Sequence, residues 1–265
     1  MAMQVGNDPS PIPPRAASRR VSTLTDIGVE RMGDAADLLA DPRVLRLENL
    51  DTDLLPPAEA LAASERAIHD DDANSYLPFF GHDALRRAAT EMVARLAGLP
   101  PESWDWRRQC FISAGGLSGI FNTLLACIDP GDEVVLTSPT YVGLINRVRL
   151  AGGVPRFVPL VPSARGWRLD IEALPRVVGP RTRAFLMMSP SMPTGAVLDA
   201  AEWRAVCEAC IAADAWMIYD AAMERLLFDG VAHLHPAGMP GMAERTVVIG
   251  ALSKEYRMIG WRVGW

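Results

Sequence analysis

Near the end of the sequence, a lysine and an arginine lie eight residues apart, just after a run that is typical of a buried strand. The run is Thr246–Ile249, the lysine is Lys254 and the arginine is Arg262. Short β-branched, apolar runs indicate buried strands. A lysine amine forms Schiff bases with carbonyl compounds once burial or nearby cations lower its pKa, and an arginine can bind an anion beside it. The alternative is a solvated lysine in a surface turn, and the other motifs distinguish between these two interpretations.

Two more segments place chemically useful groups directly after strand-like runs. Asp220 ends the run Trp216–Tyr219, and burying a carboxylate is costly unless a cation lies beside it. Gly115 and Gly116 join the run Cys110–Ser113 to a helical stretch. Glycines allow the backbone to approach a ligand closely, and the first N–H groups of a helix bind anions. A tight turn without a ligand is the competing interpretation of the two glycines.

The elements that must position these groups alternate along the chain. The predicted strands are Cys110–Ser113, Glu133–Thr137, Pro155–Val161, Ala184–Met188, Trp216–Tyr219 and Thr246–Leu252. The predicted helices are Thr25–Ala40 (weakly), Ala58–His69, Asp83–Ala97, Gly116–Ile128, Val142–Ala151, Asp170–Val178 and Asp199–Ala213. Nearly continuous apolar strands indicate a parallel sheet with helices on both faces. We therefore expect an α/β, doubly wound, mostly parallel sheet, whose ligands gather at the carboxyl ends of the strands.

Charge and composition exclude several classes of partner. The formal net charge is −6, whereas nucleic acids and anionic membranes call for a basic surface. No apolar run approaches the roughly 20 residues of a membrane helix. Polar residues follow Arg19-Arg20, which does not fit an export signal. We expect no nucleic-acid partner, no membrane and a cytoplasmic location.

The cysteines and histidines do not predict a metal site. The pair Cys207 and Cys210 lies on one helical face with Trp203, Val206 and Ile211, which indicates packing against a core in place of redox chemistry. His233 and His235 lack a second ligand pair nearby, so surface or structural roles are favoured over zinc.

The segment from Ser253 to Trp265, read as Ser-Lys-x-x-x-x-x-Gly-Trp-Arg-x-Gly-Trp, resembles the lysine motif of the class I/II aminotransferases. These are pyridoxal-phosphate (PLP) enzymes of fold type I. The resemblance runs from about residue 45 to the end, and separate motifs carry it in the family's order. Among them are Tyr76-x-Pro78-x-x-Gly81 and the turn at residues 113–117.

The resemblance implies roles at the cofactor. Lys254 would hold PLP as a Schiff base and move the Cα proton of the substrate. Asp220 would bond the pyridinium nitrogen and keep it protonated, which makes the ring an electron sink. Tyr141 would stack on the ring, at a gain of roughly 1 kcal/mol. Gly115, Gly116 and Leu117 would hold the phosphate through backbone amides.

Three further residues complete the implied set. Arg262 would bind the phosphate through two hydrogen bonds. Ser253 would add a hydroxyl beside it, because Ala251 stands where the family has a phosphate-binding serine. Tyr76 would reach the phosphate of a neighbouring subunit, which implies a homodimer.

The sequence departs from the family where two hydrogen-bond donors are expected. Met192 replaces an asparagine and Met223 a tyrosine, both of which bond the phenolic oxygen of PLP in relatives. Without donors the phenolate is less stable, so the imine proton should be held more tightly and the reaction after Cα deprotonation could change. Leu117 replaces a residue that often carries a hydroxyl. The chain also stops before the arginine that binds the substrate carboxylate, so we expect a truncation at the C-terminus.

These observations lead to a set of expectations. Residues 1–24 form a disordered arm, residues 25–70 contribute to an incomplete small domain, and residues 71–265 form a PLP-binding large domain that is cut short. The expected function is a PLP-dependent aminotransferase that acts on amino-acid and keto-acid substrates through a quinonoid. Alternatives are a PLP-dependent decarboxylase, lyase or cyclase, or a non-catalytic fragment. A nucleotide-binding protein is disfavoured, because Gly115-Gly116 lies in no Gly-x-Gly-x-x-Gly pattern.

Overall fold

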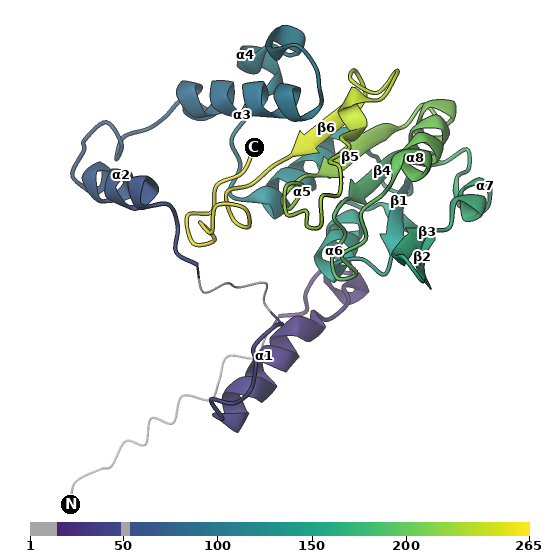
Figure 1. The fold of residues 1–265 in the computed structure, drawn as a ribbon, viewed down its shortest axis with the longest axis horizontal. Helices are drawn as coiled ribbons and strands as arrows, with labels where there is room; N and C mark the ends of the chain where they lie inside the picture. Colours follow the sequence, from purple (N-terminus) through teal and green to yellow (C-terminus); the bar gives the residue numbers. More distant parts are fainter. Residues whose placement is uncertain (1–14, 49–53) are drawn as a thin grey trace, which may run out of the picture.

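A single six-stranded sheet organises the chain (Figure 1). The computed structural model describes residues 15–48 and 54–265. The strands are β1 (Glu133–Ser138), β2 (Val154–Ser163), β3 (Gly166–Leu169), β4 (Thr182–Met188), β5 (Trp216–Asp220) and β6 (Thr246–Ile249), in the order β3-β2-β1-β4-β5-β6. Every pairing is parallel except that of β2 with β3. The predicted α/β class with a mostly parallel sheet is confirmed.

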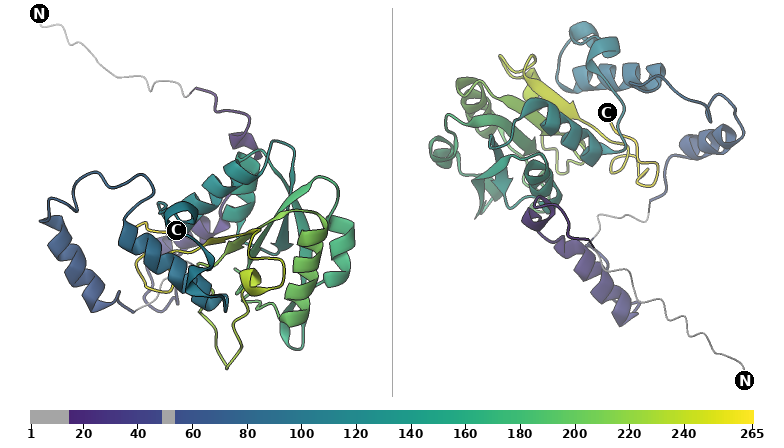
Figure 2. Two further views of the ribbon diagram at one scale, coloured as in Figure 1. Left: turned by 90° about the horizontal axis from the view of Figure 1, so that it is seen from above. Right: turned by 180° about the vertical axis from the view of Figure 1, so that it is seen from behind.

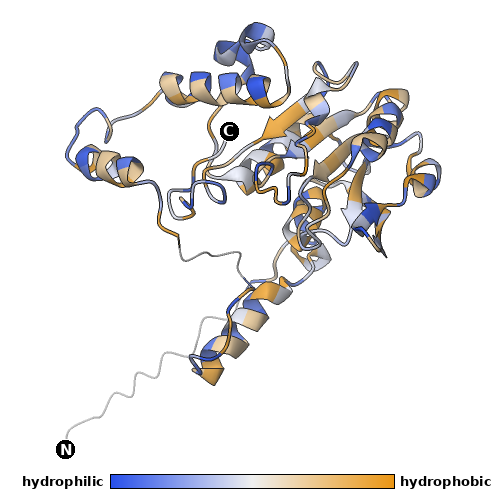
Figure 3. Ribbon diagram, viewed as in Figure 1, coloured by the Kyte–Doolittle hydropathy of each residue, from blue (hydrophilic) through white to orange (hydrophobic). Residues whose placement is uncertain are grey.

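Helices cover both faces of this sheet, which makes it doubly wound. One core cluster joins β1, β4 and β5 to α5 (Gly116–Cys127) and α6 (Val142–Leu150), and the other joins them to α7 (Leu174–Val177) and α8 (Ala200–Ala212). Hydropathy colouring shows apolar residues along the strands and on the helices, α1 (Gly28–Leu39) and α2 (Ala58–Ile68) included (Figure 3). Burial on both faces explains why the strands read as continuous apolar runs.

Helix α8 shows how the sequence determines local structure and packing together. The Asp199 side chain accepts from the backbone of Glu202, whose own side chain accepts from the Asp199 N–H, so the predicted capping box is present. Of the face predicted to be buried, Trp203, Val206, Cys207 and Cys210 are buried, whereas Ile211 near the end of the helix is exposed. Burial raises the pKa of both thiols to about 12, which leaves them protonated and unreactive at neutral pH.

Helices α1 and α2 stand apart from the sheet in Figure 1 and in the right panel of Figure 2. Neither α1 nor α2 contains a buried residue. Trp261 Nε1 donates to Ser64 Oγ at 2.8 Å and so ties α2 to the last loop. By contrast, α3 (Asp83–Leu96) has five buried residues and lies over β6, with η2 (Pro101–Ser103) and α4 (Trp106–Gln109) beside it.

Part of the predicted disordered arm is ordered against the sheet domain. Val21–Thr23 form a 3₁₀ turn, η1. Asn146 on α6 is buried, and its amide exchanges hydrogen bonds with the Thr25 backbone at 2.9 and 2.8 Å. Residues 1–14 lie outside the described residues, and the predicted domain boundaries remain predictions.

Three expected elements differ in the structure. Cys110–Ser113 is not a strand, because within the described chain only its last residue finds a ladder partner, Gly264. The predicted helix Asp170–Val178 is divided into η3 (Ile171–Ala173) and α7. The antiparallel strand β3 was not predicted, and the run from Thr246 leaves the ladder after Ile249.

No helix of the described residues is long and apolar enough to cross a membrane. The last 3₁₀ turn, η4 (Pro236–Gly238), lies in the connection between β5 and β6.

Candidate active site

The carboxyl ends of neighbouring parallel strands bring Asp220 and the lysine-bearing loop to one edge of the sheet. Asp220 is the last residue of β5 and pairs with Ile249, the last residue of β6. Ala221 N donates to Ile249 O at 2.9 Å, and Lys254 follows five residues after Ile249. The two residues predicted to be catalytic therefore leave adjacent strands at the same edge.

Asp220 is buried, with only 6% of its surface exposed. Burial raises the pKa of its carboxyl from 3.8 to about 6, against a smaller lowering by the N–H of Ala222, which donates to Oδ1 at 3.2 Å. Within the described part of the chain, no salt bridge to Asp220 is found. A cation beside this carboxylate would recover part of the free energy that burying its charge costs.

An ion pair joins the lysine loop to the turn after β5. Glu255, next to Lys254, accepts from the backbone N–H of Arg225 at 2.8 Å and forms an ion pair with its guanidinium. The Glu255 side chain is 8% exposed and that of Arg225 is 38% exposed, so the pair is partly shielded from solvent. Lys254 itself is half-buried. The sequence does not predict this pair, because nothing in the spacing of residues 225 and 255 indicates contact.

A turn with the features of an anion site, here called the anion-binding turn, is assembled from two distant segments. Gly115 precedes α5 with φ +82°, a conformation that favours glycine. A Cβ at this position would overlap the Arg262 guanidinium, so the cation lies directly against the turn. Arg262 Nη1 lies 3.4 Å from Ser253 Oγ. The structure therefore brings Gly115, Gly116, Ser253 and Arg262 together at the N-terminus of a twelve-residue helix.

Gly264 holds this arrangement in place. It forms antiparallel bridges to Ser113 on one side and to Ala251 on the other. A Cβ on Gly264 would lie 2.8 Å from the carbonyl carbon of Gly115 and 2.9 Å from the oxygen of Gly250. Because these neighbours are backbone atoms, no side chain larger than hydrogen fits at this junction.

Two further candidate residues lie in one core cluster: Tyr141, predicted to stack on the cofactor ring, and Leu117, predicted to hold the phosphate through its backbone amide. Leu117, in the first turn of α5, and Tyr141, which caps α6, both pack against the core cluster that contains Ile249. The Tyr141 ring covers Gly143, where a Cβ would collide with it. Leu117 thus contributes an apolar side chain and a helix-terminal N–H, with no hydroxyl for an anion.

Two methionines and a serine line the loops after β4 and β5. Met223 is buried and Met192 is half-buried. Ser191 Oγ is buried without a hydrogen-bond partner among the described residues. Both positions therefore carry methionine side chains, which cannot donate a hydrogen bond. The effect of this change on a bound cofactor remains a prediction.

Tyr76 is not brought to this edge. Its side chain is fully exposed in the loop between α2 and α3, without packing against the other candidate residues. Its predicted role therefore depends on a second chain.

A buried polar cluster lies just behind the Asp220 turn. His233 Nε2 lies 3.1 Å from Glu224 Oε2, and His235 Nε2 lies 3.7 Å from the same oxygen. Burial lowers the pKa of His235 to about 3, so its ring is neutral. Burial raises the pKa of Glu224. Both histidines lie beside the Glu224 carboxylate, and no group of three potential metal ligands occurs within residues 15–48 and 54–265.

The buried carboxyl leads to a prediction about stability and pH. The folded pKa of Asp220 lies above its unfolded value, so the unfolded chain loses this proton first, and the residue destabilises the fold increasingly between pH 4 and 6. Asp220→Asn removes the titration. We expect unfolding free energies from urea titrations to shift in favour of the variant by on the order of 2–3 kcal/mol between pH 4 and pH 7.

Asp129→Asn makes the same change at an exposed position and is the matched control for replacing one carboxyl by an amide. A pH-independent difference for Asp220→Asn would show that the Asp220 carboxyl titrates as in the unfolded chain.

Comparison with known proteins identifies the family. The model for aminotransferase class I and II matches residues 44–265. The probable N-succinyldiaminopimelate aminotransferase of Mycobacterium tuberculosis is 40% identical over 209 residues, which are 79% of this chain and 52% of that protein. A probable aspartate/prephenate aminotransferase of Thermus aquaticus is 32% identical over 89% of this chain and 62% of its own length.

Solved structures agree with these matches. N-succinyldiaminopimelate aminotransferase from Mycobacterium tuberculosis superposes with a TM-score of 0.86 at 35% identity, over 94% of this chain and 63% of that one. Aspartate aminotransferase from Thermus thermophilus with maleate gives 0.82 at 31% identity, over 94% and 64%. The chain spans about half to two thirds of the length of these relatives. It belongs to the class I/II aminotransferase family, whose members depend on pyridoxal phosphate.

Proposed function

We propose that this chain provides the PLP-binding core of an aminotransferase that exchanges amino groups between amino acids and keto acids. The observation that carries the proposal is the buried Asp220, which lies at the same sheet edge as Lys254. The anion-binding turn of Gly115, Gly116 and Arg262 supplies the third part of a cofactor site.

The residues match the ring nitrogen, the ring face and the phosphate of this cofactor. The cationic ring nitrogen of PLP would satisfy the Asp220 carboxylate, and its phosphate would be held by the N–H groups of Gly116 and Leu117 with the Arg262 guanidinium. Ser253 lies within reach of the same guanidinium. Tyr141 would provide an aromatic face for the ring.

The chemistry follows from these positions. When bound, the cofactor supplies an aldehyde that condenses with amines and a protonated ring that withdraws electrons from the substrate Cα. Lys254 Nζ would hold the cofactor through its aldehyde, and its amine would be the group placed to move a proton at the substrate Cα. Asp220 keeps the ring nitrogen protonated through its negative charge.

The substrates are proposed only by class. The names of the relatives include N-succinyldiaminopimelate, kynurenine, arginine and aspartate or prephenate as substrates, with oxoglutarate or pyruvate as partners. These names share an amino acid and a keto acid and differ in the side chain. A cytoplasmic location remains a prediction from the sequence.

A homodimer is supported by the apolar surface of the N-terminal segment. Large apolar side chains are exposed along α1, the residues after it and the Tyr76 loop: Met32, Leu38, Leu39, Leu45, Leu47, Leu54, Leu55, Ile68, Tyr76, Phe79 and Phe80. Exposed patches of this kind mark association surfaces. Helices without a buried residue also need tertiary contacts to be stable.

Light scattering tests this assembly. The chain should have twice its mass of 28.8 kDa at micromolar concentrations, and Leu38→Ser with Leu39→Ser should shift it toward the monomer. Arg15→Ser with Arg19→Ser, at exposed sites before α1, is the control. A native chain that stays monomeric at about 50 μM, some fiftyfold above a dissociation constant of about 1 μM, would contradict the proposal.

Covalent trapping tests the cofactor site, and the sequence makes the test specific because Lys254 is the only lysine in the chain. PLP followed by borohydride should attach one cofactor per chain, located on the peptide that contains Lys254. Lys254→Arg keeps the charge and should lose the adduct. Pyridoxal, which lacks the phosphate, should react at least tenfold less efficiently because the turn at Gly115 and Arg262 no longer holds it.

The N-terminal amine is the internal control for non-specific reaction. Modification of that amine alone, or equal labelling by pyridoxal and PLP, would contradict a built cofactor site.

A further inference from the structure

The two residues that follow Lys254 both contact one arginine of the turn after β5. Glu255 Oε1 accepts a hydrogen bond from the backbone N–H of Arg225 at 2.8 Å, and its Oε2 pairs with the Arg225 guanidinium. The same guanidinium lies 5.2 Å from the centre of the Tyr256 ring, within the range of a cation–π contact. A single side chain thus connects the lysine loop to the turn that follows Asp220.

Two further contacts hold the backbone around the lysine. The N–H of Met258 donates to Leu252 O at 3.2 Å, which closes the loop around Lys254 at its base. The Tyr256 hydroxyl lies 3.7 Å from Met92 Sδ on α3. The lysine loop is therefore held at its base, at α3 and at the turn after β5, and only the last of these three contacts carries charge.

The ion pair places two opposite charges beside the lysine amine. A lysine amine acts as a nucleophile or as a base only after it has lost its proton. An anion nearby stabilises the protonated amine, whereas a cation nearby stabilises the neutral amine. Glu255 alone would therefore keep Lys254 protonated, and Arg225 opposes this effect.

A neighbouring carboxyl already responds to both charges of the pair. Burial raises the pKa of Glu224, and the contact with His233 lowers it. Beyond these larger effects, the Glu255 carboxylate raises the pKa of Glu224 and the Arg225 guanidinium lowers it. The two charges thus act in opposite directions on a titratable group beyond their own contact, and the lysine amine next to Glu255 is exposed to the same opposition.

Other charged and titratable groups belong to the same loop or to the elements packed against it. They are Tyr256, Arg257 and Arg262 of the loop itself, Asp220 and Glu224 of the turn after β5, His233 of the connection to β6, Tyr141 before α6, and Glu91 and Arg95 on either side of Met92 in α3. A comparison between variants of the ion pair leaves all of these groups in place. Any difference between such variants therefore reports the charges of the pair.

We propose that Arg225, held by Glu255, is a positioning residue for Lys254: it fixes the lysine loop and offsets the Glu255 charge, so that the ε-amine loses its proton more readily. The pair thereby prepares the amine to attack a carbonyl carbon. Both residues act through Lys254 and not by contact with a substrate. This inference rests on the proposed function, because a neutral amine is needed here only if the lysine holds a cofactor.

Acetylation of Lys254, the only lysine in the chain, tests this role without a cofactor. The probe is acetic anhydride, which is uncharged: the neutral amine attacks one carbonyl carbon, an amide bond forms, acetate leaves and the amine proton passes to water. Labelling of the Lys254 peptide is measured by mass spectrometry between about pH 6 and pH 11, a range that brackets an ordinary lysine. N-acetyl-lysine amide in the same solution corrects for the pH dependence of the reagent. Each protein then gives a pH midpoint of labelling.

Opposite shifts of this midpoint are the expected result. Arg225→Gln should raise it and Glu255→Gln should lower it, each by about half a pH unit, as for charges roughly 10 Å apart at an effective dielectric constant of about 40. At a fixed pH below the midpoint, half a unit is a roughly threefold change in labelling. The double variant should return to the native midpoint, and Arg225→Lys, which keeps the charge, should stay there. A loop that was only loosened would change labelling in the same direction in both single variants.

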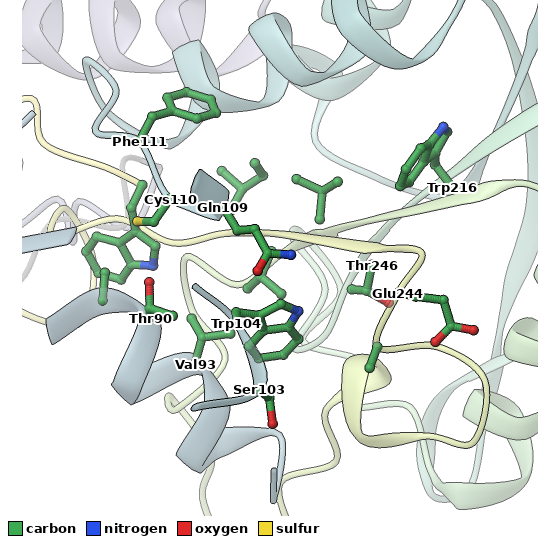
Figure 4. Close-up of a pocket in the computed structure, with 16 residues that line it drawn as sticks. Thr90, Val93, Ser103, Trp104, Gln109, Cys110, Phe111, Trp216, Glu244 and Thr246 are labelled. Atoms are coloured by element: carbon green, nitrogen blue, oxygen red, sulfur yellow. The ribbon is translucent and has the colours of Figure 1, made fainter. Parts of the chain in front are cut away.

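A second ion pair at the other ends of the same strands is the matched control. Arg245 precedes β6 and pairs with Asp214, before β5, at 3.2 Å. Figure 4 shows Trp216, Glu244 and Thr246 of this end around a separate cavity of about 520 Å³, which the lysine loop does not line. Arg245→Gln and Asp214→Asn should leave the midpoint unchanged, because salt at about 0.1 M screens charges beyond roughly 10 Å.

The results that would overturn the positioning role are distinct from those that bear on the cofactor. Shifts in the same direction, no shift in either single variant, or a double variant that does not return to the native midpoint would each overturn it. Glu255→Gln has nearly the native shape and keeps an oxygen that can accept from the Arg225 N–H, so its midpoint decides the question even where Arg225→Gln does not fold. A chain that fails to bind PLP would contradict the proposed function, and its midpoints would still be measured.

Discussion

Backbone hydrogen bonds at Gly264 are the constraint on which the candidate site depends. They join the segment before α5 to the segment after β6, although more than a hundred residues separate these in the sequence. The same contact brings the Arg262 guanidinium against Gly115, and it fixes the start of the lysine loop at Ala251. A side chain at position 264 has no space, since its neighbours there are main-chain atoms that cannot rotate away. The anion-binding turn and the lysine loop are thus positioned by one junction.

The opposite end of the site depends on burial. Asp220 is excluded from water by the sheet and the loops around it, so its charge is costly until a cation binds. Rigid surroundings maintain this state: Glu255 and Arg225 fix the turn after β5 to the lysine loop, and Glu224 with its two histidines packs behind it. A cationic group beside Asp220 would stabilise its charged form, which is why the carboxyl is a candidate for a functional role.

The sequence predicted those parts of the structure in which local pattern and tertiary environment agree. The continuous apolar strands, the capping box at Asp199 and the buried face of α8 follow from periodicity and burial, and the structure confirms them. Cys110–Ser113 has the composition of a strand, yet strand formation requires a neighbour, and composition does not show whether one is present. The Arg225–Glu255 pair and the Glu224 cluster were missed for a related reason: they join residues brought together only by the fold. The roles of Lys254, Asp220 and Arg262 came from family resemblance, and the geometry now supports their proximity.

The most direct measurement of the central claim is a crystal structure of the chain with PLP. The account predicts the ring nitrogen within hydrogen-bonding distance of an Asp220 carboxylate oxygen, with Lys254 Nζ covalently joined at the other end of the ring. The phosphate should contact the Gly116 N–H and the Arg262 guanidinium. A cofactor located elsewhere, or one whose ring nitrogen faces away from Asp220, would contradict the account.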